Sequence, residues 1–344
     1  MAQYEIESRF NKSYSIITRR IVRMLSENAR LSVTEMSKQL GVSRPTIKEK
    51  IRRLESELGM HYTIELDEGM LGLNYPHLIA IRFNKKPDYA KVKELLLKSC
   101  IPQVAFSVDG DYNMVIYANA LSGGAYAHWD KAMRILLGGY GAVWEPSEVM
   151  HRQLGFFPLR NETIERTNLD TKSKEMLKLL NENSRLSFQQ LSKRLGMHFN
   201  TVKYNFDKLF KQGYIKRTTI SMDMVKNISF LTFFANYTPA EGYESSSARA
   251  RLAVFYDDQD PLISRYLISA PLIGSHDLFA LLAFDDKATA YRYNLSYHKS
   301  LFVKHGIKMI YGEVKEVVLG RLPIRSMDTR KVFNKIIWSS DLSE

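Results

Sequence analysis

The stretch NARLSVTEMSKQLGVSRPTIKEKIRRL, residues 28–54, occurs again as NSRLSFQQLSKRLGMHFNTVKYNFDKL, residues 183–209. The second copy begins 155 positions after the first and aligns with it without a gap. A repeat of this length indicates a duplicated structural unit, so we interpret the chain as two copies of one plan. The residues of the first copy that recur unchanged are Asn28, Arg30, Leu31, Ser32, Ser37, Lys38, Leu40, Gly41, Thr46, Lys48 and Leu54.

Each copy has the pattern of a helix, a tight turn and a second helix. Ser32 with Glu35 has the spacing of a capping box, as does the corresponding pair in the second copy, Ser187 with Gln190. Gly41 lies where the turn needs a residue that accepts positive φ, and Ser43 is a favourable N-cap for the next helix.

The second helix of the first copy has an apolar stripe, Ile47, Ile51 and Leu54, and a basic remainder that we expect to point outward. This arrangement is typical of a recognition helix in the DNA major groove, although a solvated charged face is the ordinary alternative. We predict that Arg44 and Thr46 reach base edges and that Lys48, Arg52 and Arg53 make mainly phosphate contacts. Lys50 is a further candidate DNA-binding residue of this helix.

The corresponding helix of the second copy is less basic. Histidine and asparagine can read base edges and lysine can hold a phosphate, but a helix kept for packing or for a protein partner fits the same pattern. The candidate DNA-binding residues of this copy are His198, Asn200, Thr201, Lys203, Asn205 and Lys208.

The net charge of +12 is located in these two regions. Residues 1–60 contain 12 Lys and Arg against 7 Asp and Glu, and residues 168–220 contain 11 against 4. The rest of the chain is neutral, with 26 residues of each sign. Positive charge confined to two helix-turn-helix segments favours double-stranded DNA as the partner over a membrane surface.

Other features argue against membrane, disulfide and metal chemistry. The sequence has no run of about 18 apolar residues and no signal-peptide pattern, so we expect a cytoplasmic protein. Cys100 is the only cysteine, and the eight histidines have no ligand-like spacing. We therefore expect neither a metal site nor a cofactor, and no paired groups suggest catalysis.

Between and after the two helix-turn-helix segments the hydrophobic period becomes that of short strands. Residues 60–66 and 214–220 have the pattern of wings, and residues 74–160 and 227–325 each fit a β-α-β-β-α-β order, the ferredoxin-like plan. The expected fold class is α+β. The predicted domains are a winged helix-turn-helix at 1–70, a ferredoxin-like domain at 74–160, a second pair at 164–225 and 227–325, and a tail at 326–344 with a short helix at 332–338.

This order of parts resembles the Lrp/AsnC (feast/famine) family of prokaryotic transcription regulators. The resemblance rests on the helix-turn-helix and on the Gly110-Asp111-Tyr112-Asn113 turn. Family members dimerise through their ferredoxin-like domains, so the resemblance implies a single-chain pseudo-dimer, with sheets packed together and two DNA-reading heads, which can assemble further. Because the heads differ, we expect an asymmetric DNA site.

The resemblance also implies a small effector, such as an amino acid, near that turn. The candidate residues are Asp109, Gly110, Asp111, Tyr112 and Asn113, with Gly274, Ser275, His276 and Asp277 in the second copy. The alternative is that both segments are simply tight turns that need glycine and a polar neighbour.

Two other functions are compatible with this plan. Some proteins of this type are sirohaem decarboxylases, which carry a His-Asn-Tyr run, an arginine and a Trp-Phe strand. The corresponding residues 103–118, QVAFSVDGDYNMVIYA, lack the His/Arg pair and tryptophan. The other alternative is a protein-binding or chromatin-like scaffold. We expect a transcription regulator that is not an enzyme.

Overall fold

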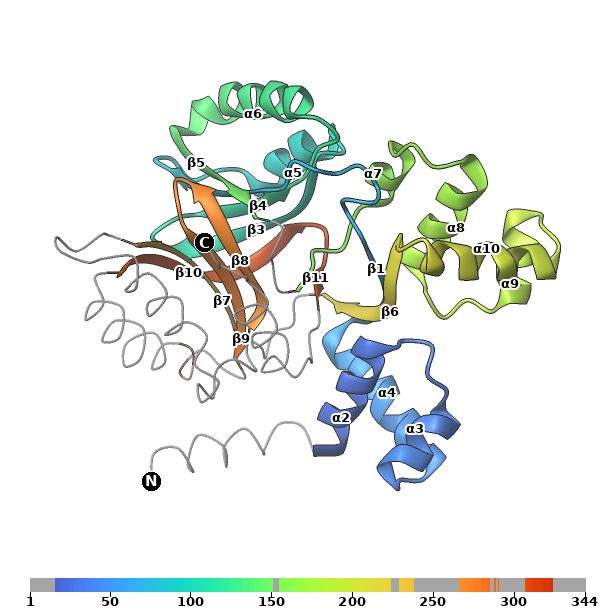
Figure 1. Cartoon of the computed structure of the whole chain (residues 1–344). Coiled ribbons are helices and arrows are strands. Elements are labelled where there is room, and N and C mark those ends of the chain that lie inside the picture. Colours follow the sequence, from blue (N-terminus) through green and yellow to red (C-terminus); the bar gives the residue numbers. More distant parts are fainter. Residues whose placement is uncertain are drawn as a thin grey trace, which may run out of the picture.

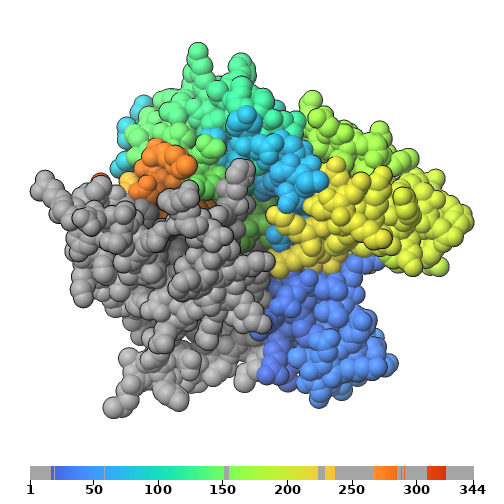
Figure 2. Space-filling model, viewed as in Figure 1, coloured from blue at the N-terminus to red at the C-terminus, as the bar shows by residue number. Residues whose placement is uncertain are grey.

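The computed structural model describes residues 16–150, 155–223, 229–237, 266–284, 288, 290 and 307–323. Within them the chain forms two helical heads and one β-barrel (Figure 1). In Figure 2 the heads protrude as a blue lobe and a yellow-green lobe from one side of the molecule. No helix among the described residues is long and apolar enough to cross a membrane.

The two heads have the predicted helix-turn-helix structure. Both capping boxes are formed, at Ser32–Glu35 and at Ser187–Gln190. Gly41 has φ 64° and Gly196 φ 61°, so each turn uses the left-handed conformation that glycine permits. The helices of head one are α2 (Ile16–Glu27), α3 (Val33–Leu40) and α4 (Arg44–Leu58), and those of head two are α8 (Thr171–Glu182), α9 (Phe188–Leu195) and α10 (Phe199–Lys211), preceded by the short α7 (Asn161–Glu165).

The strands predicted as wings pair with each other. β1 (Met60–Leu66) follows head one, β6 (Ile215–Met222) follows head two, and they run antiparallel with Thr63 opposite Thr219. Each strand also packs against the first helix of the other head: Thr63 Oγ1 donates to Asn181 O at 2.8 Å, and Thr219 Oγ1 donates to Ser26 O at 2.8 Å. The heads are therefore joined by a shared sheet, whose third strand is β11 (Leu322–Pro323).

Two arginines complete this joint. Arg30 of head one reaches into head two, where its Nη1 donates to Ser184 O at 2.6 Å and to Leu186 O at 3.0 Å. Its counterpart Arg185 donates to Leu31 O at 2.8 Å. Burial, together with the neighbouring charge of Arg185, lowers the pKa of Arg30. In each head, backbone carbonyl oxygens that follow the first helix therefore accept hydrogen bonds from an arginine of the opposite head.

The ferredoxin-like order of the first half is confirmed. It consists of β2 (His77–Phe83), α5 (Tyr89–Leu97), β3 (Pro102–Gly110), β4 (Met114–Ala118), α6 (Gly123–Leu137), the 3-10 turn η1 (Gly138–Tyr140) and β5 (Ala142–Val149). The second half supplies the four expected strands, β7 (Ser229–Tyr237), β8 (Tyr266–Gly274), β9 (Leu278–Phe284) and β10 (Ile307–Leu319). The two helices that the β-α-β-β-α-β order predicts for this half lie largely outside the described residues, and the tail at 326–344 lies wholly outside them.

The two sheets do more than pack face to face, because their edges are hydrogen bonded. β10 pairs with β3 and β5 pairs with β8, which closes an eight-stranded barrel in the order β10-β3-β4-β2-β5-β8-β9-β7. Alternation along β2 places Leu78 and Ala80 in the interior cluster and Ile79 and Ile81 in the cluster that faces α5 and α6.

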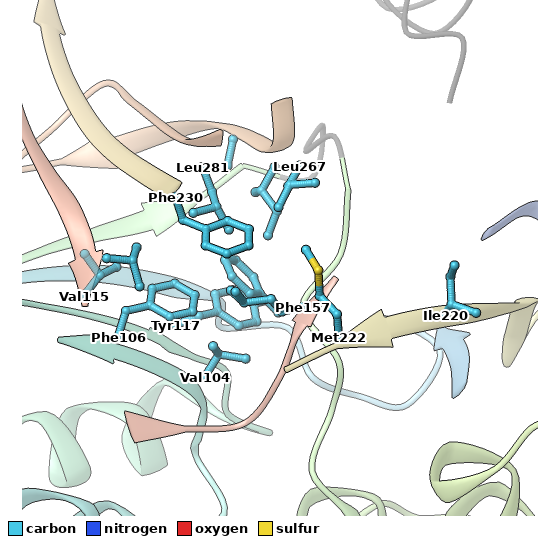
Figure 3. Packing of buried hydrophobic residues seen from close by; sticks show 14 of the residues in the cluster. Val104, Phe106, Val115, Tyr117, Phe157, Ile220, Met222, Phe230, Leu267 and Leu281 are labelled. Carbon is cyan, nitrogen blue, oxygen red and sulfur yellow. The ribbon is translucent and has the colours of Figure 1, made fainter. Parts of the chain in front are cut away.

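The interior of the barrel also connects it to the heads. Phe157, from the segment that leaves the first half, stacks on Tyr117 with ring centroids 4.4 Å apart. Met222 of β6 lies beside Phe157, and Phe230 and Leu281 reach the same cluster from the second half (Figure 3). One apolar core therefore holds both ferredoxin-like units and the end of the head-to-head sheet.

Replacing Arg30 with alanine should lower the free energy of unfolding by about 1–3 kcal/mol, because two partly buried carbonyl oxygens lose a charged donor. Denaturant titration measures the change. Arg23→Ala is the matched control, since the Arg23 side chain is exposed and pairs with Glu27, and its loss should cost less than about 1 kcal/mol. Equal costs for the two variants would contradict the role of Arg30.

Replacing Leu54 of α4 or Leu209 of α10 with alanine should lower the free energy of unfolding by about 2–5 kcal/mol, because a cavity is left beneath that helix. Their exposed fractions are 1% and 2%. Leu136→Ala, at a leucine that is 52% exposed, should change stability by less than about 0.5 kcal/mol. Thermal melts that do not separate these variants would show that the helix faces are wrongly assigned.

Candidate nucleic-acid interface

The first turn of α4 presents an open polar surface. Arg44, Thr46 and Lys48 are exposed, while Ile47 and Leu54 on the opposite side are buried. Ser43 caps the helix by accepting from Thr46 N at 3.3 Å, and its hydroxyl lies 2.8 Å from Thr46 Oγ1. The cap fixes the residues at the start of the helix, which is the part of a recognition helix that reaches base edges.

The three later basic residues of α4 are arranged differently from one another. Arg52 is exposed and pairs with Glu49 at 3.1 Å, and Arg53 is exposed and pairs with Glu57 at 2.9 Å. Lys50 departs from the expected outward placement, because it is half-buried and its Nζ donates to Thr18 Oγ1 of α2 at 3.4 Å. The basic surface of head one thus centres on Arg44, Lys48, Arg52 and Arg53.

In head two, α10 has a mixed surface. His198 is the N-cap, and its Nδ1 accepts from Asn200 N at 3.3 Å. The predicted residues Asn200, Thr201, Lys203 and Lys208 are exposed, and Asn205 is half-buried. Sequence reasoning passed over two aromatic residues on this surface, Phe199 and Tyr204, with exposed fractions of 40% and 67%.

The strands after the heads add little free positive charge. Lys216 lies 3.3 Å from Asp67, and Arg217 donates to Glu65 at 2.6 Å with a side chain only 20% exposed. These pairs link β6 to β1 and to the residue that follows it, so any phosphate contact of Lys216 or Arg217 would have to compete with them.

The turn proposed to hold an effector lies where β3 pairs with β10. This is one of the two strand pairs that join the halves of the barrel, and each such pair is called a seam below. Asp111 N donates to Tyr311 O at 2.9 Å, and Asp111 Oδ2 accepts from Tyr311 N at 3.0 Å. Tyr112 is buried and donates to Thr232 Oγ1 at 2.7 Å. A Cβ at Gly110 would meet Tyr311 O at 2.3 Å, so this close approach requires glycine. Asp109, Gly110 and Asp111 are exposed.

The remaining residue of this turn has a local structural role. Asn113 Oδ1 accepts from Phe83 N at 2.7 Å, and Asn113 N donates to Ile81 O at 2.8 Å. Its carbonyl oxygen also accepts from the Tyr89 hydroxyl at 3.0 Å. Asn113 therefore ties the turn to β2 and α5.

The corresponding turn of the second half lies at the other seam. His276 is buried; its N donates to Ser147 Oγ at 2.9 Å, its Nδ1 lies 3.0 Å from Asn236 Oδ1, and its Nε2 is 3.5 Å from Glu145. Burial lowers the pKa of His276. Gly274 and Ser275 are exposed and Asp277 is half-buried. Both turns therefore connect one half to the other.

Among the described residues, no group of three or more His, Cys, Asp and Glu side chains could hold a metal ion. A cavity of about 250 Å³ lies where the heads meet the barrel, lined by Thr63, Arg160, Asn181, Ser221 and Arg321 among others. Ser221 Oγ in its wall is buried and has no hydrogen-bond partner in the described part of the chain.

Both heads match models of known DNA-binding domains. Residues 17–55 match the AsnC-type helix-turn-helix domain, and residues 169–216 match a winged helix-turn-helix DNA-binding domain. The two matches contain the two copies of the repeat and include most of α4 and all of α10.

Curated relatives resemble part of the chain. The HTH-type transcriptional regulator LrpC of Bacillus subtilis is 30% identical over 87 residues, which are 25% of this chain and 58% of LrpC. The HTH-type transcriptional regulator FL11 of Pyrococcus furiosus is 31% identical over 103 residues, 29% of this chain and 66% of FL11. The chain thus matches less than two thirds of each of these relatives.

Solved structures extend the likeness to nearly the whole chain. The siroheme decarboxylase NirDL aligns with a TM-score of 0.54 and 12% identity, over 94% of this chain and 99% of that one. NirDL in co-complex with an iron-uroporphyrin III analogue aligns with a TM-score of 0.51 and 13% identity. At this identity the likeness shows that the two-unit fold is shared. In sequence, the two heads thus resemble AsnC-type and winged helix-turn-helix DNA-binding domains, and part of the chain resembles the regulators LrpC and FL11.

Proposed function

We propose that this protein is a sequence-specific DNA-binding transcription regulator that contacts double-stranded DNA with two non-identical heads. The observation that carries the proposal is the exposed N-terminal part of α4, with Arg44, Thr46 and Lys48, in a head that matches the AsnC-type domain. Arginine there suits guanine and threonine suits several bases, while Lys48, Arg52 and Arg53 suit phosphates.

The joint between the heads supports binding as a unit. β1 and β6 pair along their length. Arg30 of head one donates to a carbonyl oxygen of head two, and Arg185 of head two donates to one of head one. When one head is bound to its half-site, a rigidly linked second head binds without a further loss of rotational freedom. The binding free energies of the two heads therefore add. Because α4 and α10 differ in sequence, the preferred DNA site is asymmetric.

We propose that an effector binds at the predicted turn through the exposed carboxylates of Asp109 and Asp111, competing with Lys315, which lies 3.3 Å from Asp109, and with Tyr311 N, which donates to Asp111. Tyr112, Asn113 and His276 are engaged in contacts that hold the barrel together. Such a ligand would carry an amine. Further assembly of the pseudo-dimer stays a prediction.

The enzyme alternative shares the fold with the NirDL structures but lacks supporting residues at positions 103–118. The proposed non-enzymatic role is supported instead by the confinement of surplus positive charge to residues 1–60 and 168–220. Neutral charge over the rest of the chain is compatible with a barrel that mainly holds the heads.

The test is binding of the purified chain to genomic DNA fragments across a salt series. Saturable binding that favours some fragments and weakens steeply with salt is the expected result. Equal binding to all fragments would favour a chromatin-like scaffold. No binding at low salt would contradict the proposal, and binding of an iron tetrapyrrole would then favour the enzyme.

The double variant Arg52→Ala/Arg53→Ala should weaken binding to all fragments alike. It should flatten the plot of log affinity against log salt by about 2, because each lost phosphate contact removes about one released counterion. Arg23→Ala, on the exposed side of α2, is the control. An unchanged slope in the double variant would contradict the phosphate role.

Replacing Glu49 with glutamine should strengthen DNA binding. The change removes a negative charge from α4 and releases Arg52 from its 3.1 Å pair. We expect about threefold tighter binding at low salt, with the gain shrinking as salt rises and screens the charge. Glu27→Gln on α2 is the control, and binding by Glu49→Gln that is as unchanged as that of the control would show that this side of α4 faces away from DNA.

A further inference from the structure

The duplication allows the two recognition helices to be compared position by position. The offset of 155 that aligns the repeat places Phe199 where head one has Arg44, and Tyr204 where head one has Glu49. Thr46 and Lys48 recur as Thr201 and Lys203. Later in the helix Asp207 stands where head one has Arg52, and in the first turn an arginine is exchanged for a phenylalanine.

The Phe199 side chain is held in place although it is 40% exposed. Its ring meets Phe188 of α9 edge to face, with centroids 6.2 Å apart. Phe188 in turn packs on Phe206 at 5.2 Å and lies 5.0 Å from the Arg30 guanidinium carbon of head one. One part of the Phe199 ring is thus fixed by an aromatic cluster, and the other part faces outward at the start of α10.

Base edges in the major groove distinguish these two side chains. Arginine pairs with the two acceptors of guanine, whereas an apolar side chain finds an apolar partner only in the 5-methyl group of thymine. The first turn of a recognition helix is the part that reaches these edges. The surrounding side chains favour DNA over a protein partner, since α9 and α10 expose the cations Lys193, Arg194, Lys203 and Lys208.

We propose that Phe199 determines specificity in the half-site of head two by contacting the 5-methyl group of a thymine. This inference rests on the proposed function, because it requires that head two enters a major groove. Head two then prefers a thymine where head one, through Arg44, prefers a guanine.

The experiment uses the full chain and the genomic fragment that it binds most tightly. Each thymine of that duplex is replaced in turn by uracil, which lacks only the methyl group, and affinity is measured at one salt concentration. We expect one or two replacements, all within one half-site, to weaken binding about fourfold, the effect of removing one methyl group from an apolar contact.

Variants of the protein show which side chain is responsible for the loss of affinity when thymine is replaced by uracil. In Phe199→Ala, whose fold is checked by a thermal melt, thymine and uracil duplexes should bind equally. Phe199→Leu keeps an apolar group and should retain a difference, and Arg44→Ala, in the other head, should retain the full fourfold loss.

Three results would overturn the inference. Uracil could be neutral at every position of a tightly bound fragment, or the loss could be the same in Phe199→Ala as in the unaltered chain. Either result leaves the regulator proposal standing and favours a protein partner for Phe199. Absence of preferential binding to any fragment would overturn both proposals together.

Discussion

The antiparallel pairing of β1 with β6 is the interaction on which the arrangement of the heads depends. In the sequence each strand follows one head, but in the fold it packs against the first helix of the other head. The hydrogen bonds from Thr63 to Asn181 and from Thr219 to Ser26 show this. A strand placed in this way cannot move with its own head alone. The two heads therefore form one unit whose geometry is set by hydrogen bonds.

The barrel imposes the same constraint at the other end of the molecule. Two strand pairs, β10 with β3 and β5 with β8, join the two halves of the barrel. A turn lies at each pair and contacts the other half: Tyr112 donates to Thr232, and His276 N donates to Ser147. Phe157 and Met222 then connect the barrel core to the head sheet (Figure 3). The apolar core is therefore continuous from the barrel to the sheet that the heads share.

The local structure was largely predictable from the sequence, and the contacts between halves were not. Capping boxes and the Gly41 turn depend on neighbours within a few residues, so their residue types identify them. The alternation in HYTIEL predicts a strand but carries no information about its partner. Arg30 recurs in the repeat, but only the structure gives the reason, which is its contact with the opposite head.

The candidate site shows the same division. Arg44, Thr46 and Lys48 were placed correctly on the exposed side by helical periodicity, whereas the contact of Lys50 with Thr18 depends on how α2 crosses α4. Phe199 and Tyr204 were overlooked because aromatic residues in an amphipathic pattern usually belong to the core. Comparison with the first copy would have identified them, since basic and acidic residues stand at the corresponding positions.

The central claim is that two unlike heads, held in a fixed arrangement, bind two unlike half-sites at once. Hydroxyl-radical footprinting of the full chain on its tightest genomic fragment tests this most directly. We expect two protected regions on one face of the duplex, separated by a whole number of helical turns and different in sequence. Protection of a single half-site, or of two regions on opposite faces, would contradict the claim.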